Sequence, residues 1–304
     1  MRLMIWANSV FGRNVFSFLL VFVMAYFFVR RGEARRASMT FLQRVRKCYP
    51  DALGNAPLLW LSYRQIYNFG QSLLDKFLAW ADTPTSIAMA PDEEEMLFAA
   101  MTKDRGCLLI GSHFGNLEYS RGIAHRHPGL KINVLLYDQH ALKFAAIIAQ
   151  GDPESRMNLI QVTDVDIELA IRLKEKVERG EWVVIAGDRV PVRNNGRVCS
   201  ARFFNERASF PVGPYALASL LQCPVYLLHC FRLRGDYQLV LEFFAERIQT
   251  DRRNRQAAYE GYAQNFATSL EKQVAREPLQ WFNFFDFWDS QRPAKTQGGQ
   301  RSTA

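Results

Sequence analysis

Residues 107–118 read CLLIGSHFGNLE, and the interpretation of the whole chain starts from this stretch. The apolar run at its start is typical of a short buried strand. Gly111 and Gly115 give the next turn its backbone freedom, and Ser112 is suited to cap a helix. A short helix is predicted from Glu118 to Ile123, ended by the Pro-Gly pair at 128–129. The stretch therefore predicts a strand, a turn and a helix.

This turn brings together one imidazole, His113, and one carboxylate, Glu118. Five positions along a regular helix rotate a side chain by roughly 140°, so the two groups meet only if His113 precedes the helix. A carboxylate held against one ring nitrogen fixes the tautomer and leaves the other nitrogen free to take a proton from a substrate. Because no nucleophilic residue accompanies the pair, the motif favours transfer of a group to an external hydroxyl or amine.

The His-x-x-x-x-Glu spacing after an apolar strand resembles the lysophospholipid acyltransferase superfamily. Within it, the chain is similar to the late acyltransferases of lipid A biosynthesis, the lauroyl- and myristoyl-transferase type. The resemblance covers most of residues 1–290, beginning with the apolar amino-terminal segment. It is then carried, in order, by Arg35-Arg36, Cys48-Tyr49-Pro50, His113 to Glu118, Ala186-Gly187-Asp188-Arg189, Phe203-Phe204, Ala208, and the Leu217-Ala218 helix before Cys223-Pro224-Val225.

Two positions and one segment depart from the pattern of the lipid A enzymes. Arg189 stands where glutamine usually follows Gly-Asp, and Asn205 stands where glycine usually follows the paired phenylalanines. The aromatic segment Trp281–Trp288 lacks the usual His and Arg-rich ending. These departures leave the acyl-transfer centre intact and bear on the identity of the acceptor.

The resemblance and the residues together imply a catalytic pair. His113 would act as general base, and Glu118 would orient and polarise it. Gly115, through the N–H groups of its turn, and Asn116 sit where an oxyanion could be stabilised, although ordinary turn formation explains them equally well.

Three further residues are candidates for binding substrate. Asp188 and Arg189 follow a predicted strand at its carboxyl end, the edge where open α/β sheets build their sites, and we expect them on the acceptor side. A surface ion pair is the alternative. Arg156 corresponds, by resemblance, to a phosphate-binding arginine, and a solvated loop charge is equally consistent with it.

An acyl thioester is the donor that this chemistry suits. A thiol has a pKa of roughly 8.5, so a thiolate leaves with little acid catalysis, and neither a metal nor a redox cofactor is expected. The donor is acyl carrier protein or acyl coenzyme A. The net charge of +8 over 304 residues favours an acidic partner or an anionic membrane surface. Five cysteines without a Cys-x-x-Cys pair favour a reducing compartment.

Residues 15–29 carry no charge and lie between Arg13 and Arg30-Arg31. This run is shorter than the ~20 apolar residues of a spanning helix, so a short span and a half-inserted anchor are both open, and a buried core helix is the alternative. A cleaved signal peptide is disfavoured because arginines come directly after the run. The arginines and lysine between residues 30 and 47 place the rest of the chain on the cytoplasmic face of the inner (cytoplasmic) membrane.

The remaining sequence alternates strands and helices. Helices are predicted at 38–55, 58–81, 141–150, 164–179 and 252–276, and strands at 131–137, 159–162, 182–186, 225–232 and 238–244. This predicts an α/β fold with a mostly parallel twisted sheet flanked by helices, as in glycerolipid acyltransferases, and an amino-terminal membrane-anchoring helix. The expected division is an anchor at 1–31, an acyltransferase domain at 32–290 and a disordered tail at 291–304.

Other functions are compatible with parts of the sequence. A metallohydrolase is disfavoured because the His-Glu-x-x-His spacing is absent, and a nucleic-acid binder because the basic residues cluster beside the apolar segment. A non-catalytic lipid-binding or assembly protein could keep the same fold. The acceptor is a membrane lipid: a lipid A precursor, a glycerolipid and another amphiphile all fit, and so does transfer to an amine.

Overall fold

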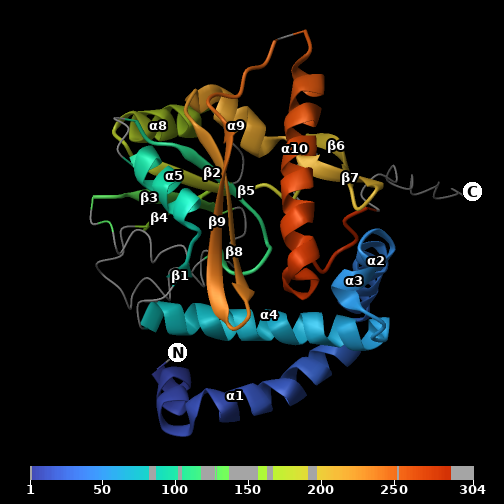
Figure 1. Cartoon of the computed structure of the whole chain (residues 1–304). Helices are drawn as coiled ribbons and strands as arrows, with labels where there is room; N and C mark the ends of the chain where they lie inside the picture. Colours follow the sequence, from blue (N-terminus) through green and yellow to red (C-terminus); the bar gives the residue numbers. More distant parts are fainter. Residues whose placement is uncertain are drawn as a thin grey trace, which may run out of the picture.

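A computed structural model describes residues 2–81, 87–101, 105–117, 127, 129–136, 157–162, 167–190, 197–251 and 253–288. The predicted helices at 118–123 and 141–150 and the predicted tail at 291–304 lie outside these ranges. The fold is the expected α/β type, and Figure 1 shows a sheet flanked by helices.

A seven-stranded sheet forms the centre of the fold, in the order β1-β9-β8-β2-β5-β3-β4. The strands β8, β2, β5, β3 and β4 all run parallel, which confirms the predicted mostly parallel sheet. β9 returns antiparallel to β8 as a hairpin, and the short β1 pairs with β9. In sheet order the bounds are β1 Ile87–Ala88, β9 Asp236–Ala245, β8 Val225–Leu233, β2 Leu108–Gly111, β5 Trp182–Ala186, β3 Ile132–Leu136 and β4 Met157–Gln161.

Alternate residues of the central strands face two separate apolar layers. On one side, Leu108 and Ile110 of β2 join a core with residues of α8 (Ile167–Glu178), α9 (Gly213–Leu221) and α10 (Arg255–Arg276). On the other side, Leu109 joins a smaller core with α5 (Pro91–Met101). Because both faces are covered, the strands read as continuous apolar runs.

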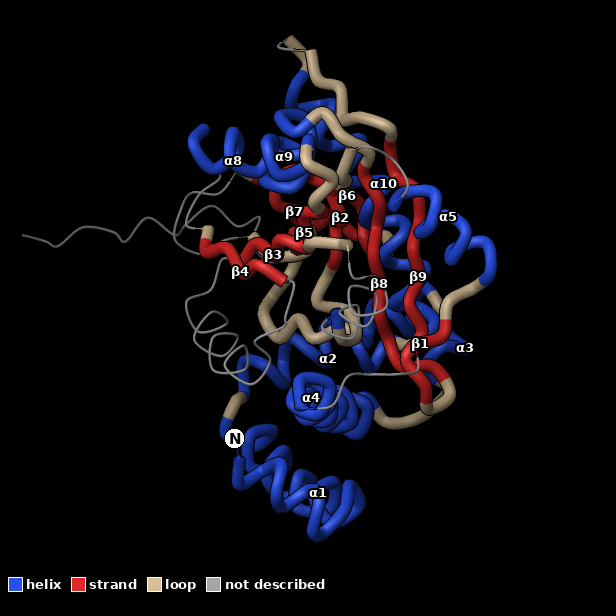
Figure 2. Tube along the Cα trace, turned by 90° about the vertical axis from the view of Figure 1, so that its left-hand side faces the viewer, coloured by secondary structure: helices blue, strands red, loops and turns tan. Residues whose placement is uncertain are grey.

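The amino-terminal helices lie at the carboxyl ends of the parallel strands. α4 (Leu58–Ala81) crosses below the sheet at the end where β8 stops, and α1 (Arg2–Arg30) lies beneath α4, as both views show (Figures 1 and 2). α2 (Gly32–Cys48) and α3 (Pro50–Leu53) connect them. Tyr63 and Tyr67 of α4 donate hydrogen bonds to the carbonyls of Val21 and Ser17 on α1.

The described part of α1 has a strongly apolar surface. Large side chains are exposed along it, and Phe18, Phe22 and Tyr26 each have about 60% of their surface open. Within the described residues, no single helix meets the length and hydropathy of a membrane span. The two segments Val15–Arg30 and Gly32–Cys48 meet it only as a pair, and they are bent by 94° at the break between them.

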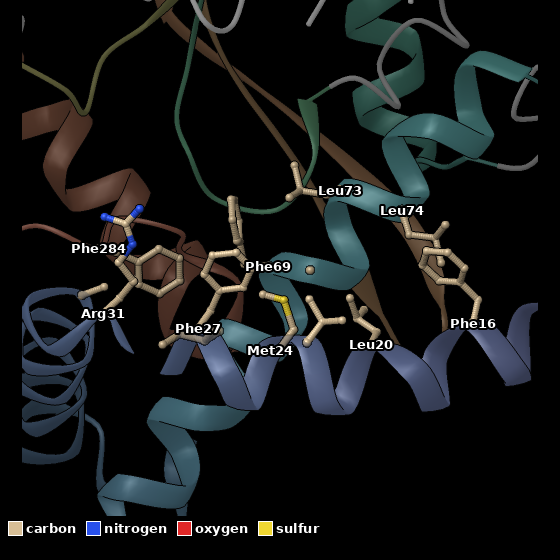
Figure 3. Close-up of a pocket in the computed structure, with 13 residues that line it drawn as sticks. Phe16, Leu20, Met24, Phe27, Arg31, Phe69, Leu73, Leu74 and Phe284 are labelled. Carbon is tan, nitrogen blue, oxygen red and sulfur yellow. The ribbon is translucent and has the colours of Figure 1, made fainter. Parts of the chain in front are cut away.

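An apolar pocket of about 370 Å³ separates α1 from α4. Phe16, Leu20 and Met24 of α1 form one wall, and Figure 3 shows Leu73 and Leu74 of α4 on the opposite side. Phe284 and Arg31 stand together at one end of the pocket (Figure 3).

A second, two-stranded sheet was absent from the sequence predictions. β6 (Val198–Phe203) and β7 (Glu206–Pro211) form an antiparallel hairpin whose turn residues, Phe204 and Asn205, have φ of 50° and 60°. Positive φ at both central residues is the type I′ arrangement, in which asparagine and glycine are the favoured residues. This explains how Asn205 can stand where the lipid A enzymes that the sequence resembles usually carry glycine.

The positive φ of Asn205 predicts how substitutions at this position change stability. Asn205→Gly is expected to keep or slightly raise the free energy of unfolding, because glycine adopts positive φ without strain. Asn205→Val is expected to lower it by roughly 1–2 kcal/mol, the cost of a branched residue in the left-handed region. Urea unfolding measures both. Asn254→Val is the matched control, because Asn254 has φ −120° and makes no capping hydrogen bond through its side chain; equal losses at 205 and 254 would contradict the prediction.

Candidate active site

The candidate site is built where two neighbouring parallel strands end. β2 and β5 pair in register from Leu108 with Val183 to Gly111 with Ala186, so the loops after them start side by side. The N–H of Gly187 donates to the carbonyl of Gly111 at 2.8 Å, which continues the pairing one step beyond the strands. Residues 112–116 and 187–189 are thereby held against each other, although they lie far apart in the sequence.

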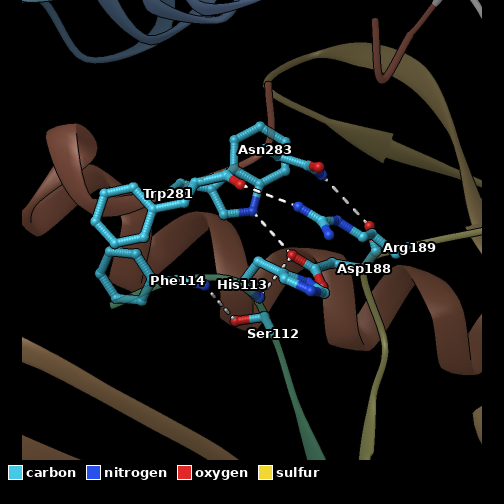
Figure 4. A network of polar contacts seen from close by, with 8 residues as sticks. Ser112, His113, Phe114, Asp188, Arg189, Trp281 and Asn283 are labelled. Carbon is cyan, nitrogen blue, oxygen red and sulfur yellow. Dashed lines mark hydrogen bonds and ion pairs between the residues drawn. The ribbon is translucent and has the colours of Figure 1, made fainter. Parts of the chain in front are cut away.

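His113 and Asp188 form the central pair of the site (Figure 4). His113 Nδ1 lies 2.7 Å from Asp188 Oδ1, and the His113 backbone N–H donates to Asp188 Oδ2 at 2.9 Å. A third of the His113 side chain is exposed, whereas Asp188 is fully buried. Because an ionised carboxylate only accepts hydrogen bonds, this contact places the proton on Nδ1 and leaves Nε2 as the basic nitrogen.

The charge of Asp188 is stabilised by its surroundings. Burial raises the pKa of this carboxyl, but the charge and hydrogen bonds of His113, with the charge of Arg189, outweigh burial and hold the pKa below its ordinary value. Asp188 is therefore ionised at neutral pH. A buried carboxylate of this kind keeps an imidazole in one tautomer and stabilises the imidazolium that forms when Nε2 takes a proton.

The segment at residues 280–283 closes over this pair from the carboxyl-terminal part of the chain. The indole N–H of Trp281 donates to Asp188 Oδ2 at 3.1 Å, and the N–H of Phe282 donates to the His113 carbonyl at 2.9 Å. The Asn283 amide donates to the Asp188 carbonyl at 3.4 Å. Sequence reasoning treated Trp281–Trp288 as a departure from a family pattern and missed this role, although six aromatic residues in eight were a sign of a buried segment.

Gly115 fixes the path of the His113 turn. Its φ is +70°, and a Cβ atom there would collide with the carbonyl oxygen of Cys230 on β8, so only glycine fits. The Gly115 N–H donates to the Gln280 carbonyl and the Asn116 N–H donates to the Cys230 carbonyl. Both N–H groups are therefore engaged inside the fold and do not point to a free oxyanion site in this conformation.

Asn116 and Ser112 have structural contacts of their own. Asn116 is buried and its amide donates to the Ser72 carbonyl of α4 at 3.3 Å. The Ser112 hydroxyl accepts a hydrogen bond from the Phe114 N–H at 3.4 Å. The turn is thus linked to β8, to α4 and to the 280–283 segment.

The other predicted site residues are placed differently. Arg189 is exposed, and its guanidinium donates to the Phe282 carbonyl at 3.3 Å and lies over the Phe285 ring. It is not in a surface ion pair with Asp188, because Asp188 is buried and turned towards His113. Glu118 and Arg156 lie outside the described residues, so the partner that the structure gives to His113 is Asp188, and the role of Glu118 stays a prediction.

A second histidine lies behind the turn. His229 is fully buried, contacts the Phe114 ring and lies 3.3 Å from the Ser269 hydroxyl. Burial lowers its pKa to about 4, against the opposing charges of Glu242 and Asp188, so His229 is neutral at physiological pH. Across the described ranges, no three His, Cys, Asp or Glu side chains gather as a metal ion would require.

A polar pocket of about 440 Å³ opens beside the turn, between α4 and the end of β8, and Ser17 of α1 also lines it. Its wall includes Gly115, close to His113 in the same turn, together with Gln71 and Asp75 of α4 and Arg232 at the end of β8. Neighbouring residues along α4 line the two pockets, and the rotation of about 100° per residue separates them onto opposite faces of that helix.

Comparison with known protein families gives a match over most of the chain. The family model described as bacterial lipid A biosynthesis acyltransferase matches residues 10–290, most of the chain. It spans the His113 turn, the Asp188 loop and the 280–283 segment. A search of curated proteins gave no significant match.

The pairing of Asp188 predicts how stability depends on pH. Because the folded pKa lies below the unfolded value of ~3.9, the ionised carboxylate contributes stability above about pH 4, and this contribution is lost as the pH falls through the folded pKa. Asp188→Asn is expected to lose roughly 2–3 kcal/mol of unfolding free energy at pH 7, and a smaller amount below about pH 4.

Urea unfolding across this pH range, followed by tryptophan fluorescence, measures the difference. Asp236→Asn at the exposed β8–β9 turn is the control and is expected to change stability little. A gap between wild type and Asp188→Asn that stayed constant with pH would count against an ionised Asp188.

Proposed function

This chain belongs to the bacterial lipid A biosynthesis acyltransferase family, and we propose that it moves a fatty acyl group from an acyl thioester to a hydroxyl of a lipid or glycolipid acceptor, with His113 as general base. The observation that carries the proposal is the 2.7 Å contact between His113 Nδ1 and the buried Asp188 carboxylate, at the carboxyl ends of two central parallel strands. Ligands of open α/β sheets bind at this edge.

The proposed reaction begins at Nε2 of His113. This nitrogen takes the proton of the acceptor hydroxyl as the oxygen attacks the thioester carbonyl, and Asp188 stabilises the imidazolium. The tetrahedral intermediate then collapses, the carbon–sulfur bond breaks, and the imidazolium returns the proton to the leaving thiolate. The products are an ester and a free thiol, and the step needs neither a metal nor a redox cofactor.

The polar pocket is the proposed place for the acceptor head group. It adjoins Gly115 and offers amide, carboxylate and guanidinium groups that can hydrogen-bond hydroxyls. We assign Gly115 and Asn116 to shaping this wall and the turn. Exposed Arg189 is proposed to contact an anionic group of the acceptor, since a guanidinium binds phosphate or carboxylate through two hydrogen bonds. Glu118 and Arg156 are proposed to assist the base and to bind phosphate, respectively.

Acyl carrier protein or acyl coenzyme A is the proposed donor, and the inner membrane is the proposed location, with the catalytic domain on its cytoplasmic face. Membrane association is a property of the family. The exposed apolar side chains of α1 and the basic residues from Arg30 to Lys47 support contact with an anionic bilayer surface.

His113 provides the direct test of this function. His113→Ala is expected to lose at least ~100-fold in the rate of thiol release from an acyl thioester in the presence of a bacterial lipid extract, measured on protein whose circular dichroism shows that it is folded. It is also expected to lower thermal stability, because the buried Asp188 carboxylate loses its imidazole partner. Mass spectrometry of the lipids identifies the acylated acceptor. His127→Ala, which removes a ring that contacts Phe98, is the control and is expected to retain activity. A fully active His113→Ala protein would contradict the proposed mechanism.

Trp281 is predicted to act as a positioning residue through Asp188. Trp281→Phe keeps an aromatic ring but removes the hydrogen bond to Asp188 Oδ2, worth about 1.5 kcal/mol, and is expected to lower kcat roughly tenfold with little change in the acceptor KM. Trp288→Phe is the matched control, because its indole donates to the Phe203 carbonyl instead. Equal effects of the two variants, or a change confined to KM, would show that Trp281 matters for packing alone.

A further inference from the structure

We propose that the apolar pocket between α1 and α4 binds one hydrocarbon chain of an acidic membrane phospholipid that is not a reactant, with the lipid phosphate at Arg31. This goes beyond the proposed acyl transfer, because it assigns a lipid site away from the reacting groups.

The walls of the pocket suit a hydrocarbon chain. Leu20, Val23 and Met24 of α1 face Ile66, Leu73 and Leu74 of α4 across a space of about 370 Å³. Gly70 of α4 lies against α1 side chains, and a Cβ atom there would come within 2.6 Å of the Met24 sulfur. Each CH2 group transferred from water into such a space contributes about 0.8 kcal/mol.

Charge at one end of the pocket selects the head group. Arg31 is the only charged residue among the described residues that line the pocket, and it stands beside Phe284 at one end (Figure 3). Within the described ranges its guanidinium has no hydrogen-bond or ion-pair partner. The neighbouring Arg35 differs, because it donates to the Phe28 carbonyl and lies over the Phe28 ring. A cation at the end of an apolar pocket complements an amphiphile with an anionic head.

The position of the pocket favours a lipid that enters from a bilayer. Phe27, which lines the pocket, and Phe22, which does not, are both exposed on α1, so the pocket adjoins an apolar surface of the kind that meets membranes or partners. A hydrocarbon chain can therefore reach it sideways from the membrane interface.

Aromatic side chains lie between the proposed lipid site and the His113 turn. Phe69 contacts both Phe282 and Phe284 at 5.5 Å between ring centroids, and neither the His113 turn nor the Asp188 loop lines the pocket. The acyl thioester whose carbonyl reacts at His113 is therefore a different molecule from the lipid in the apolar pocket. The rings also connect the two places, since the N–H of Phe282 donates to the His113 carbonyl. A bound chain would support the segment that holds the catalytic turn.

Native mass spectrometry of the full chain in detergent, titrated with phosphatidylglycerol or with phosphatidylcholine of the same chains, tests the site without donor or acceptor. Wild type is expected to retain one phosphatidylglycerol in preference to phosphatidylcholine. Leu20→Trp fills the pocket and is expected to weaken this binding at least tenfold. Leu19→Trp is the matched control, because Leu19 is the next residue of the same helix, is 56% exposed and does not line the pocket.

Arg31→Gln tests the head group without changing the pocket wall. It is expected to reduce the preference for phosphatidylglycerol about fivefold, the effect of one arginine near an anionic lipid, whereas Arg30→Gln is expected to leave it unchanged. Equal binding by Leu20→Trp and Leu19→Trp, or equal effects of Arg31→Gln and Arg30→Gln, would overturn the proposal.

Competition separates this site from the substrate sites. If the lipid that is acylated in the activity assay displaces phosphatidylglycerol at equal concentration, the pocket belongs to the acceptor and the proposal of a separate lipid fails, while acyl transfer itself stands. If His113→Ala abolishes transfer but binds phosphatidylglycerol normally, both assignments are supported. Loss of the proposed acyl transfer in every assay would leave the binding result unaffected, because that measurement contains no reaction.

Discussion

The structure of the site depends on one buried carboxylate. Asp188 has no exposed surface, and an uncompensated charge in such a place costs several kcal/mol. Its two oxygens are satisfied by the imidazole and the backbone N–H of His113 and by the indole of Trp281. These three donors come from two distant parts of the chain, so the same requirement that stabilises the charge also fixes the His113 ring.

Buried hydrogen bonds connect Trp281 to the amino-terminal helices α2 and α4. Ser38 of α2 donates to Gln65 of α4 at 2.5 Å, and Gln65 donates to the Trp281 carbonyl at 2.6 Å. All three side chains are fully buried, so these hydrogen bonds are protected from water. Through Trp281 they continue to Asp188 and His113. The helices that come after the apolar α1 are thus part of the structure that positions the His113 ring.

The sequence was sufficient for the parts of the fold that have a strong local pattern. The apolar runs of β2 and β5 and the amphipathic period of α8 were predicted close to their observed bounds, because period and composition are local properties. The β6–β7 hairpin was missed because an asparagine in a type I′ turn after two phenylalanines gives no Asn-Gly signal. The antiparallel direction of β9 is set by a tight turn at Arg234 and Gly235.

The carboxylate partner of His113 shows the limit of local patterns most clearly. The spacing of His113 and Glu118 offered one carboxylate, and Asp188 was singled out because it follows a strand at its carboxyl end. That Asp188 contacts His113 depends on β5 lying next to β2 in the sheet, although β3 and β4 come between them in the chain. Strand order is a tertiary property, and no spacing along the sequence encodes it directly.

The proposed base, His113, follows β2 at its carboxyl end, and the parallel strands end towards α4 and the exposed apolar helix α1. A polar pocket adjoins the base on one face of α4, and an apolar pocket lies on the opposite face. Under the proposed function, the head group of the acceptor enters the polar pocket while its chains stay in the bilayer beside the exposed side chains of α1, because the apolar pocket is assigned to a lipid that does not react. Since a helix is only about 10 Å across, the proposed reacting lipid and the proposed bound lipid would lie close to each other on the two faces of α4.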